Sequence, residues 1–167
     1  MSNYQTSEHN ARLILRSIAE RYGLGPEDLQ DLRPSSDPPK IMSPDDAFTL
    51  IAPRLSVKDR EVFVVICLDT RNGVKAVEEL YVGTINSSHI RVAEVFKKAI
   101  TINSPSIIIA HNHPSGDPTP SPEDVSMTKA IFEAGKLLDI ELLDHLVIGS
   151  NSGSFISLKT RNLGFGG

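Results

Sequence analysis

Short runs of β-branched and other apolar residues recur from residue 61 onward, and each has the length of a strand. The first run, Glu61–Leu68, is followed by Asn72-Gly73 and then by a second run, Val74–Val82. Asn-Gly between two such runs is typical of a tight turn, so residues 61–82 are predicted to form an antiparallel hairpin. Further strands are predicted at 106–110, 140–148 and 155–158.

Three other segments carry apolar residues at helical spacing. Ser43 precedes Pro44 and stands three residues before Asp46, an arrangement that begins a helix, which we expect to end near Leu55. Residues 91–101 and 122–138 also place their apolar residues on one face, as helices do. Strands interleaved with helices predict an α+β fold, a mostly antiparallel or mixed sheet flanked by helices.

The first 42 residues have a different pattern from the rest of the chain. They begin with polar residues and then carry an apolar stripe from Ala11 to Ile18, which predicts a helix within residues 1–32. Residues 33–42 contain three prolines and two serines, a composition typical of linkers. We therefore predict a helical extension with a proline-rich linker over 1–42 and a compact domain over 43–167.

The bulk composition narrows the class of protein. A length of 167 residues with 40% hydrophobic residues suits one globular domain. The formal net charge of −4 argues against sequence-independent binding of nucleic acid, which needs a basic surface. The single cysteine, Cys67, excludes an internal disulfide and a cysteine-based zinc site, and we expect it in the core. Neither a signal-peptide pattern nor a long apolar run occurs, so we expect a cytoplasmic protein that does not contact membranes.

The candidate chemistry lies between residues 106 and 130. An apolar strand ends in His111-Asn112-His113-Pro114, and residues two apart in a strand point to the same side. Asp124 follows 11 residues after His113, in the first turn of a predicted helix. Two imidazoles and one carboxylate make a three-ligand zinc site with a position left for water. The residues alone leave a simpler explanation open: surface histidines, and an acidic residue favoured at a helix N-terminus.

The spacing of these residues resembles the JAMM motif of the JAB/MPN metalloproteases, His-x-His-Pro followed by Ser-x-x-Asp, which ends here at Ser121 and Asp124. The surrounding segments 110–124 and 141–149, with Gly83-Thr84, look like the bacterial RadC family. The resemblance covers roughly residues 57–160. It implies a JAB/MPN fold of the cytidine-deaminase-like kind, with Zn²⁺ held by His111, His113 and Asp124. It also implies cleavage of a peptide or isopeptide bond in a protein or peptide substrate.

The resemblance further implies a catalytic glutamate early in the first strand of the hairpin. Glu61 matches that place, and Glu78 and Glu79 on the return strand are the alternatives. Glu61 would accept the proton of a metal-activated water and pass it to the leaving amine. Ser121 would donate a hydrogen bond to the developing oxyanion, although its hydroxyl has only one proton to give.

Two interpretations stay open at this point. Asp144-His145 interrupts an apolar strand, so it is either an outward-facing polar pair or a group that orients a ligand histidine. The RadC resemblance also allows a non-catalytic module associated with DNA repair, which would contact DNA or a repair or replication partner. The complete ligand pattern favours the hydrolase.

Overall fold

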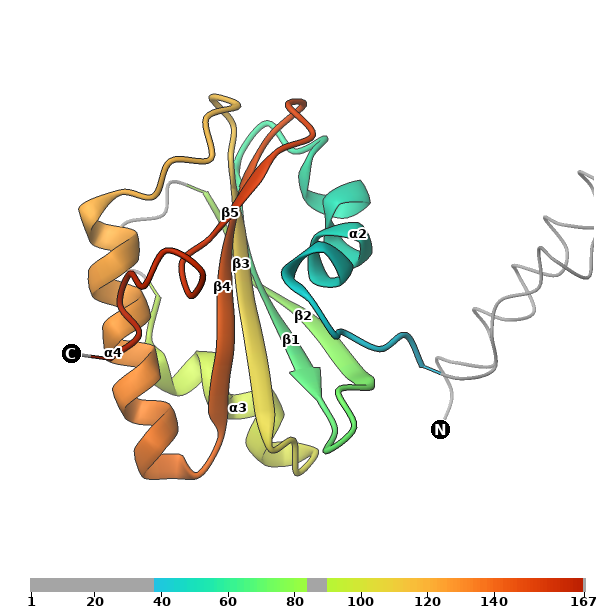
Figure 1. Ribbon diagram of the computed structural model, residues 1–167, viewed down its shortest axis with the longest axis vertical. Helices are drawn as coiled ribbons and strands as arrows, with labels where there is room; N and C mark the ends of the chain where they lie inside the picture. Colours follow the sequence, from blue (N-terminus) through green and yellow to red (C-terminus); the bar gives the residue numbers. More distant parts are fainter. Residues whose placement is uncertain (1–37, 84–89, 167) are drawn as a thin grey trace, which may run out of the picture. The chain divides into compact units, whose positions relative to one another are not determined.

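The computed structural model describes residues 38–83 and 90–166 (Figure 1). The helix predicted within residues 1–32 lies outside the described residues, and so does the start of the proline-rich linker. Residues 38–42 are described, and their backbone pairs with the turn of the hairpin: Val74 N–H donates to Pro39 O and Ile41 N–H donates to Asn72 O, both at 2.9 Å. The Ile41 side chain is buried in the core, so this end of the linker segment packs with the domain.

A five-stranded mixed sheet forms the centre of the domain, in the order β2-β1-β3-β4-β5. The pairs β1–β2, β1–β3 and β4–β5 are antiparallel, as predicted for most of the sheet, and β3–β4 is parallel. A helix connects β3 to β4, as parallel neighbours require. The strands are β1 Glu61–Leu68, β2 Val74–Gly83, β3 Ser106–His113, β4 Glu141–Gly149 and β5 Phe155–Ser157.

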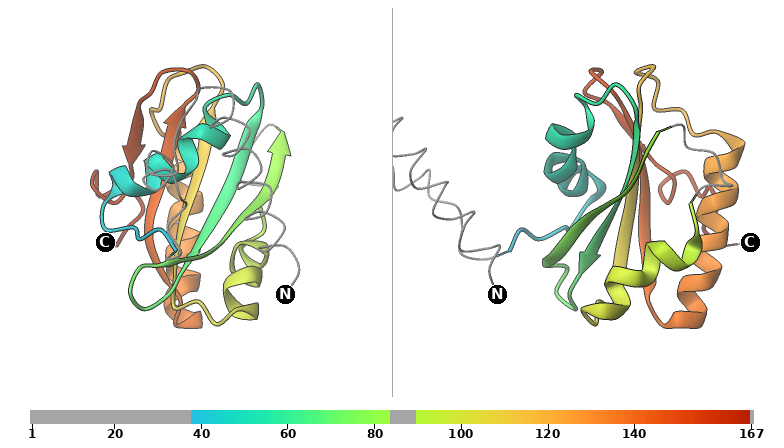
Figure 2. Two further views of the ribbon diagram at one scale, coloured as in Figure 1. Left: turned by 90° about the vertical axis from the view of Figure 1, so that its right-hand side faces the viewer. Right: turned by 180° about the vertical axis from the view of Figure 1, so that it is seen from behind.

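Helices cover both faces of this sheet (Figures 1 and 2). One face packs against α2, and the other packs against α3 and α4, so the fold is α+β as the sequence predicts. Alternate residues of β1 enter the two core layers: Val64 faces α2, while Val65 and Cys67 face α3 and α4. Cys67 is fully buried, which confirms its predicted place in the core. The described helices are α2 Pro44–Leu55, α3 Val92–Thr101 and α4 Pro122–Leu138.

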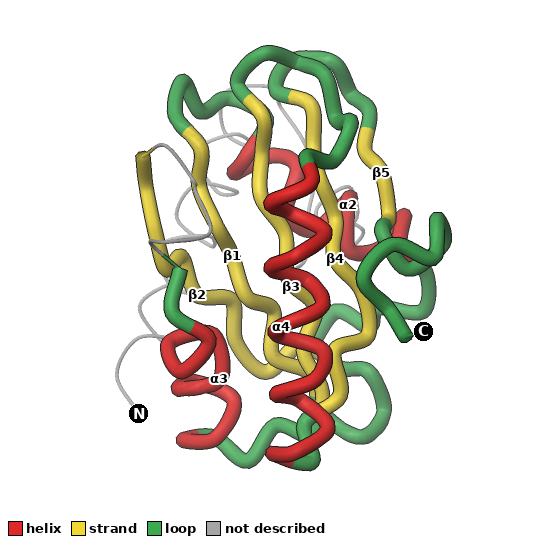
Figure 3. Tube along the Cα trace, turned by 90° about the vertical axis from the view of Figure 1, so that its left-hand side faces the viewer, coloured by secondary structure: helices red, strands yellow, loops and turns green. Residues whose placement is uncertain are grey.

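The fold brings the ends of four elements to one end of the sheet. In Figure 3 the start of β1, the ends of β3 and β4, and the beginning of α4 lie at the same end of the domain. This follows from the pairing, because β1 runs antiparallel to β3 while β4 runs parallel to it. Side chains at these positions are therefore held by separate elements around one point. No helix in the described part of the chain is long and apolar enough to cross a membrane.

Candidate metal centre

Strand β3 carries both histidines. It continues beyond the predicted 106–110 to His113, because β1 pairs with it up to His111 and β4 pairs with it up to His113. Because His111 and His113 are two residues apart on one strand, both imidazoles point to the same face of the sheet, the face that α4 covers. His111 is 1% exposed and packs against the ring of Phe63, the residue of β1 with which it is paired.

Helix α4 supplies the carboxylate. Ser121 caps this helix and Asp124 closes a capping box, in which Ser121 N–H donates to Asp124 Oδ2 at 2.7 Å and Asp124 N–H donates to Ser121 Oγ at 3.1 Å. This arrangement holds the carboxylate at the N-terminus of the helix, where a negative charge is favoured. Asp124 is only 4% exposed.

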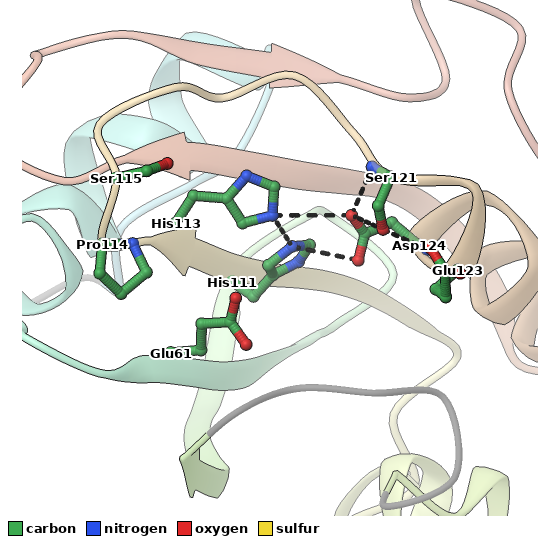
Figure 4. Close-up of a pocket in the computed structure, with 8 residues that line it drawn as sticks. All are labelled: Glu61, His111, His113, Pro114, Ser115, Ser121, Glu123 and Asp124. Carbon is green, nitrogen blue, oxygen red and sulfur yellow. Dashed lines mark hydrogen bonds and ion pairs between the residues drawn. The ribbon is translucent and has the colours of Figure 1, made fainter.

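The three ligand groups converge in one pocket (Figure 4). The Nε2 atoms of His111 and His113 are 3.0 Å apart, Asp124 Oδ1 lies 3.3 Å from His111 Nε2, and Asp124 Oδ2 lies 3.6 Å from His113 Nε2. Bonds of about 2.0–2.2 Å in a tetrahedral zinc site place neighbouring ligand atoms roughly 3.3–3.5 Å apart. The measured separations bracket this range, so the three residues fit such an ion.

The protonation of the ligand groups agrees with this fit. His113 Nδ1 lies 2.9 Å from the carbonyl oxygen of Asp117, which only accepts, so Nδ1 carries a proton and Nε2 can hold either a second proton or a metal ion. The hydrogen bond to Asp124 raises the pKa of His113, against the effect of burial. Although burial alone would raise the pKa of Asp124, hydrogen bonds from His111 and His113 hold it well below its usual range. The pocket therefore favours a positive charge between these groups, either a proton or a metal ion.

Glu61 lies in the same pocket, at the start of β1. Its charge contributes to the raised pKa of His113. Glu78 instead forms an ion pair with Lys98 of α3 at 2.9 Å, and neither Glu78 nor Glu79 lines the pocket. The described residues that line it are Glu61, His111, His113, Pro114, Ser115, Ser121, Glu123 and Asp124.

Ser121 has its hydroxyl at the edge of the ligand group. Its Oγ donates to Asp124 Oδ2 at 2.7 Å while it accepts from Asp124 N–H. The one hydroxyl proton is thus directed at the carboxylate in this structure, and it would have to rotate to reach a substrate oxygen.

Asn112 and His145 are buried near the candidate ligands; the sequence assigns no role to Asn112 and leaves that of His145 open. Asn112 lies between the two histidines but faces the opposite side of the sheet, where it binds the backbone at the start of β1. His145 is fully buried, so an outward-facing position for Asp144-His145 is wrong. The pair is divided instead: Asp144 accepts from Ser157 Oγ at 2.7 Å, and His145 Nε2 lies 2.9 Å from His111 Nδ1.

Comparison with known proteins gives one family. The family model described as the RadC-like JAB domain matches residues 41–163. A "UPF0758 protein" of Roseiflexus castenholzii is 54% identical over 158 residues, which cover 95% of this chain and 60% of that protein. Proteins of the same name from Roseiflexus sp. (strain RS-1) and Chloroflexus aurantiacus are 54% and 50% identical, each over 75% of this chain. The chain spans only 53–60% of the length of these relatives.

Proposed function

This chain belongs to the family of RadC-like JAB domains, and from that premise we propose that it is a zinc-dependent hydrolase of peptide or isopeptide bonds. One observation carries the proposal: two imidazole Nε2 atoms and a buried carboxylate converge in a pocket that Glu61 also lines. The three ligand atoms come from β3 and from the first turn of α4, so the fold itself holds them together. Two nitrogens and one oxygen are a ligand set of catalytic zinc sites.

His111, His113 and Asp124 would hold the ion. When bound, zinc makes water a nucleophile near neutral pH and polarises the carbonyl of the substrate. The protein side chains supply the proton transfers and the orientation. The same three ligand types also suit iron(II), so the experiment must identify which metal is bound.

Glu61 is the proposed general base and acid. Its carboxylate lies in the pocket beside the ligand histidines, where it would accept the proton of the attacking water and then deliver it to the leaving nitrogen. Position supports this role over Glu78, which is held by Lys98, and over Glu79, which does not line the pocket. Ser121 would turn its hydroxyl proton from Asp124 to the oxyanion, while its backbone N–H stays bonded to the carboxylate.

The proposed substrate is a protein or peptide chain, as the resemblance to the JAB/MPN metalloproteases implies. A complete ligand set supports a hydrolase over the non-catalytic DNA-associated module. Among the described residues that line the pocket, Glu61, Glu123 and Asp124 are acidic, and their negative charge disfavours a phosphate backbone.

The first test is the metal content of the purified full chain, measured for the parent and for His113→Ala. We expect about one zinc per chain in the parent and a large loss in the variant, because two ligands rarely retain a catalytic ion. The control is Ser115→Ala. It changes a residue that lines the pocket but is not a proposed ligand, so this variant should keep the metal. Parent protein that takes up no metal, even when zinc is supplied, would contradict the proposal and favour the binding module.

The second test is hydrolysis of a mixed set of fluorogenic peptides and lysine-ε-linked isopeptides by the zinc-loaded chain. Glu61→Gln should keep its zinc but lose at least 100-fold in turnover, as expected for a positioned acid–base group. Glu79→Gln removes an exposed carboxylate outside the pocket and is the matched control. Full turnover in a zinc-loaded Glu61→Gln variant would show that the role given to Glu61 is wrong.

A further inference from the structure

His145 is a fully buried imidazole directly behind the ligand His111, and the proposed reaction does not use it. Its two ring nitrogens contact two different side chains: Nε2 lies 2.9 Å from His111 Nδ1, and Nδ1 lies 2.6 Å from Thr128 Oγ1. We propose that Thr128 and His145 form a one-way chain of hydrogen bonds that fixes His111 in the tautomer able to bind the metal. This inference rests on the metal site of the proposed function and assigns two positioning residues to it.

The direction of the chain is set at Thr128. Its hydroxyl lies 2.6 Å from the backbone carbonyl oxygen of Asp124, four residues earlier in α4. A carbonyl only accepts, and a threonine hydroxyl has a single proton, so that proton points to Asp124. Towards His145 the same hydroxyl can therefore only accept, which places a proton on His145 Nδ1.

The tautomer of His145 then fixes that of His111. A neutral imidazole with its proton on Nδ1 has a bare Nε2, and a fully buried ring without a carboxylate on either nitrogen is costly to charge. His145 Nε2 therefore accepts, and His111 Nδ1 donates to it. In the neutral ring that would bind a metal, His111 Nε2 is left with its lone pair, and this atom lies 3.0 Å from His113 Nε2 and 3.3 Å from Asp124 Oδ1.

The two ligand histidines are thus controlled in different ways. Asp117 O, which only accepts, determines the tautomer of His113 directly. His145 can accept or donate, so it directs His111 only because Thr128 directs it in turn. The series of hydrogen bonds ends on the backbone of Asp124. It therefore connects His111 of β3 to the residue of α4 that supplies the third proposed ligand. In this series of hydrogen bonds Thr128 contacts no side chain that would bind the metal, yet loss of its hydroxyl should weaken metal binding.

The experiment combines a direct reading of the tautomers with a matched set of variants. Long-range nitrogen–proton NMR of ¹⁵N-histidine-labelled, zinc-loaded full chain reports which ring nitrogen carries each proton. We expect His145 and His111 to be protonated on Nδ1. A proton on His145 Nε2 in the zinc-loaded parent would overturn the proposal whatever the variants do.

Zinc affinity, measured by competition with a chelator, tests the role of the hydroxyl. Thr128→Val keeps the shape but removes the hydroxyl, and should weaken zinc binding about 10–100-fold, the usual effect of losing a group that orients a ligand. Thr128→Ser keeps the hydroxyl and should restore most of the affinity. Ser126→Ala is the control, because Ser126 Oγ makes the same bond to a backbone carbonyl four residues earlier, Pro122 O at 2.9 Å, but at the surface.

These outcomes separate the two proposals. Parent protein that binds no zinc would overturn the proposed function and this inference together. Parent protein that binds zinc, with the affinity unchanged in folded Thr128→Val, would overturn only the inference. Circular dichroism of each variant establishes that it is folded before its affinity is compared.

Discussion

Replacing Asn112 with alanine should destabilise the domain and misplace Glu61 without removing the candidate metal ligands. Asn112 is fully buried on the face of β3 opposite the two histidines. Its Oδ1 accepts from Val62 N–H at 2.8 Å, and its Nδ2 donates to Arg60 O at 3.1 Å and to Ser150 Oγ at 3.0 Å. One side chain therefore holds the residues on both sides of Glu61 and links them to the end of β4.

The size of the effect follows from these partners. Val62 is fully buried, so its N–H group would lose its acceptor with no water to replace it, at a cost of about 1–3 kcal/mol. Arg60 is exposed, so its carbonyl can bind water instead and adds little. The bonds also fix the orientation of the amide, since the atom near Val62 N–H must be the oxygen. We expect the free energy of unfolding to fall by about 1–3 kcal/mol.

Urea denaturation followed by circular dichroism measures this change, because the chain has no tryptophan for fluorescence. Lys129→Ala, an exposed change on α4, is the control. Zinc affinity should stay near that of the parent, because the ligands face away from Asn112, while turnover should fall with the displacement of Glu61. An unfolding free energy within about 0.5 kcal/mol of the parent would contradict this expectation, since that is the range of an ordinary surface change.

Four further predictions follow from other parts of the structure. Zinc at about 100 times its dissociation constant should raise the unfolding free energy by about 2.7 kcal/mol, and a chelator should remove the gain in urea titrations. In metal-free protein, burial lowers the pKa of His145 well below its usual value, so below about pH 6.5 only the unfolded state takes up that proton. As the pH decreases below this value, the contribution of His145 to the free energy of unfolding should fall by up to about 1.4 kcal/mol per pH unit. The variant His145→Phe should reduce this slope. Gly149→Ala should destabilise the domain in the same assay, because an added Cβ would collide with the backbone of Gly116. Burial raises the pKa of the Cys67 thiol to about 11, so it should react with a thiol reagent at pH 8 only as the chain unfolds.

The boundaries of the helices could be predicted because the residues that determine them are local. The sequence predicts a helix over 122–138, and α4 spans Pro122–Leu138, with the Ser121 capping box at its start. Its end is marked by Asp139 in a left-handed conformation, a feature that interrupts helical geometry within one residue. The order of the strands is different, because it depends on which apolar faces pack together after the elements form. The parallel pairing of β3 with β4 therefore became visible only in the structure.

The candidate ligands could also be selected from the sequence. His111 and His113 are two residues apart on a strand, and Asp124 lies in the first turn of the following helix, so local geometry limits where each can point. The buried side chains next to these candidate ligands, and their hydrogen-bond partners, could not be predicted from the sequence. Asn112 and Thr128 contact residues 50 and 17 positions away, Val62 and His145, and no local pattern marks such partners.

A single irregularity in β4 explains why the sequence leaves the role of His145 open. Simple alternation along β4 would put Leu142 and Asp144 on one face and His145 on the other. The pairing with β3 shifts register between Ile107 and Ile108, so Leu143 is an extra residue and the alternation reverses after it. Leu142 and His145 consequently face α4 together, while Asp144 faces β5. No glycine or proline marks the shift in the sequence, and only the burial of an imidazole between His111 and Thr128 reveals what the extra residue achieves: it turns a polar group of β4 towards the ligand that it is proposed to orient.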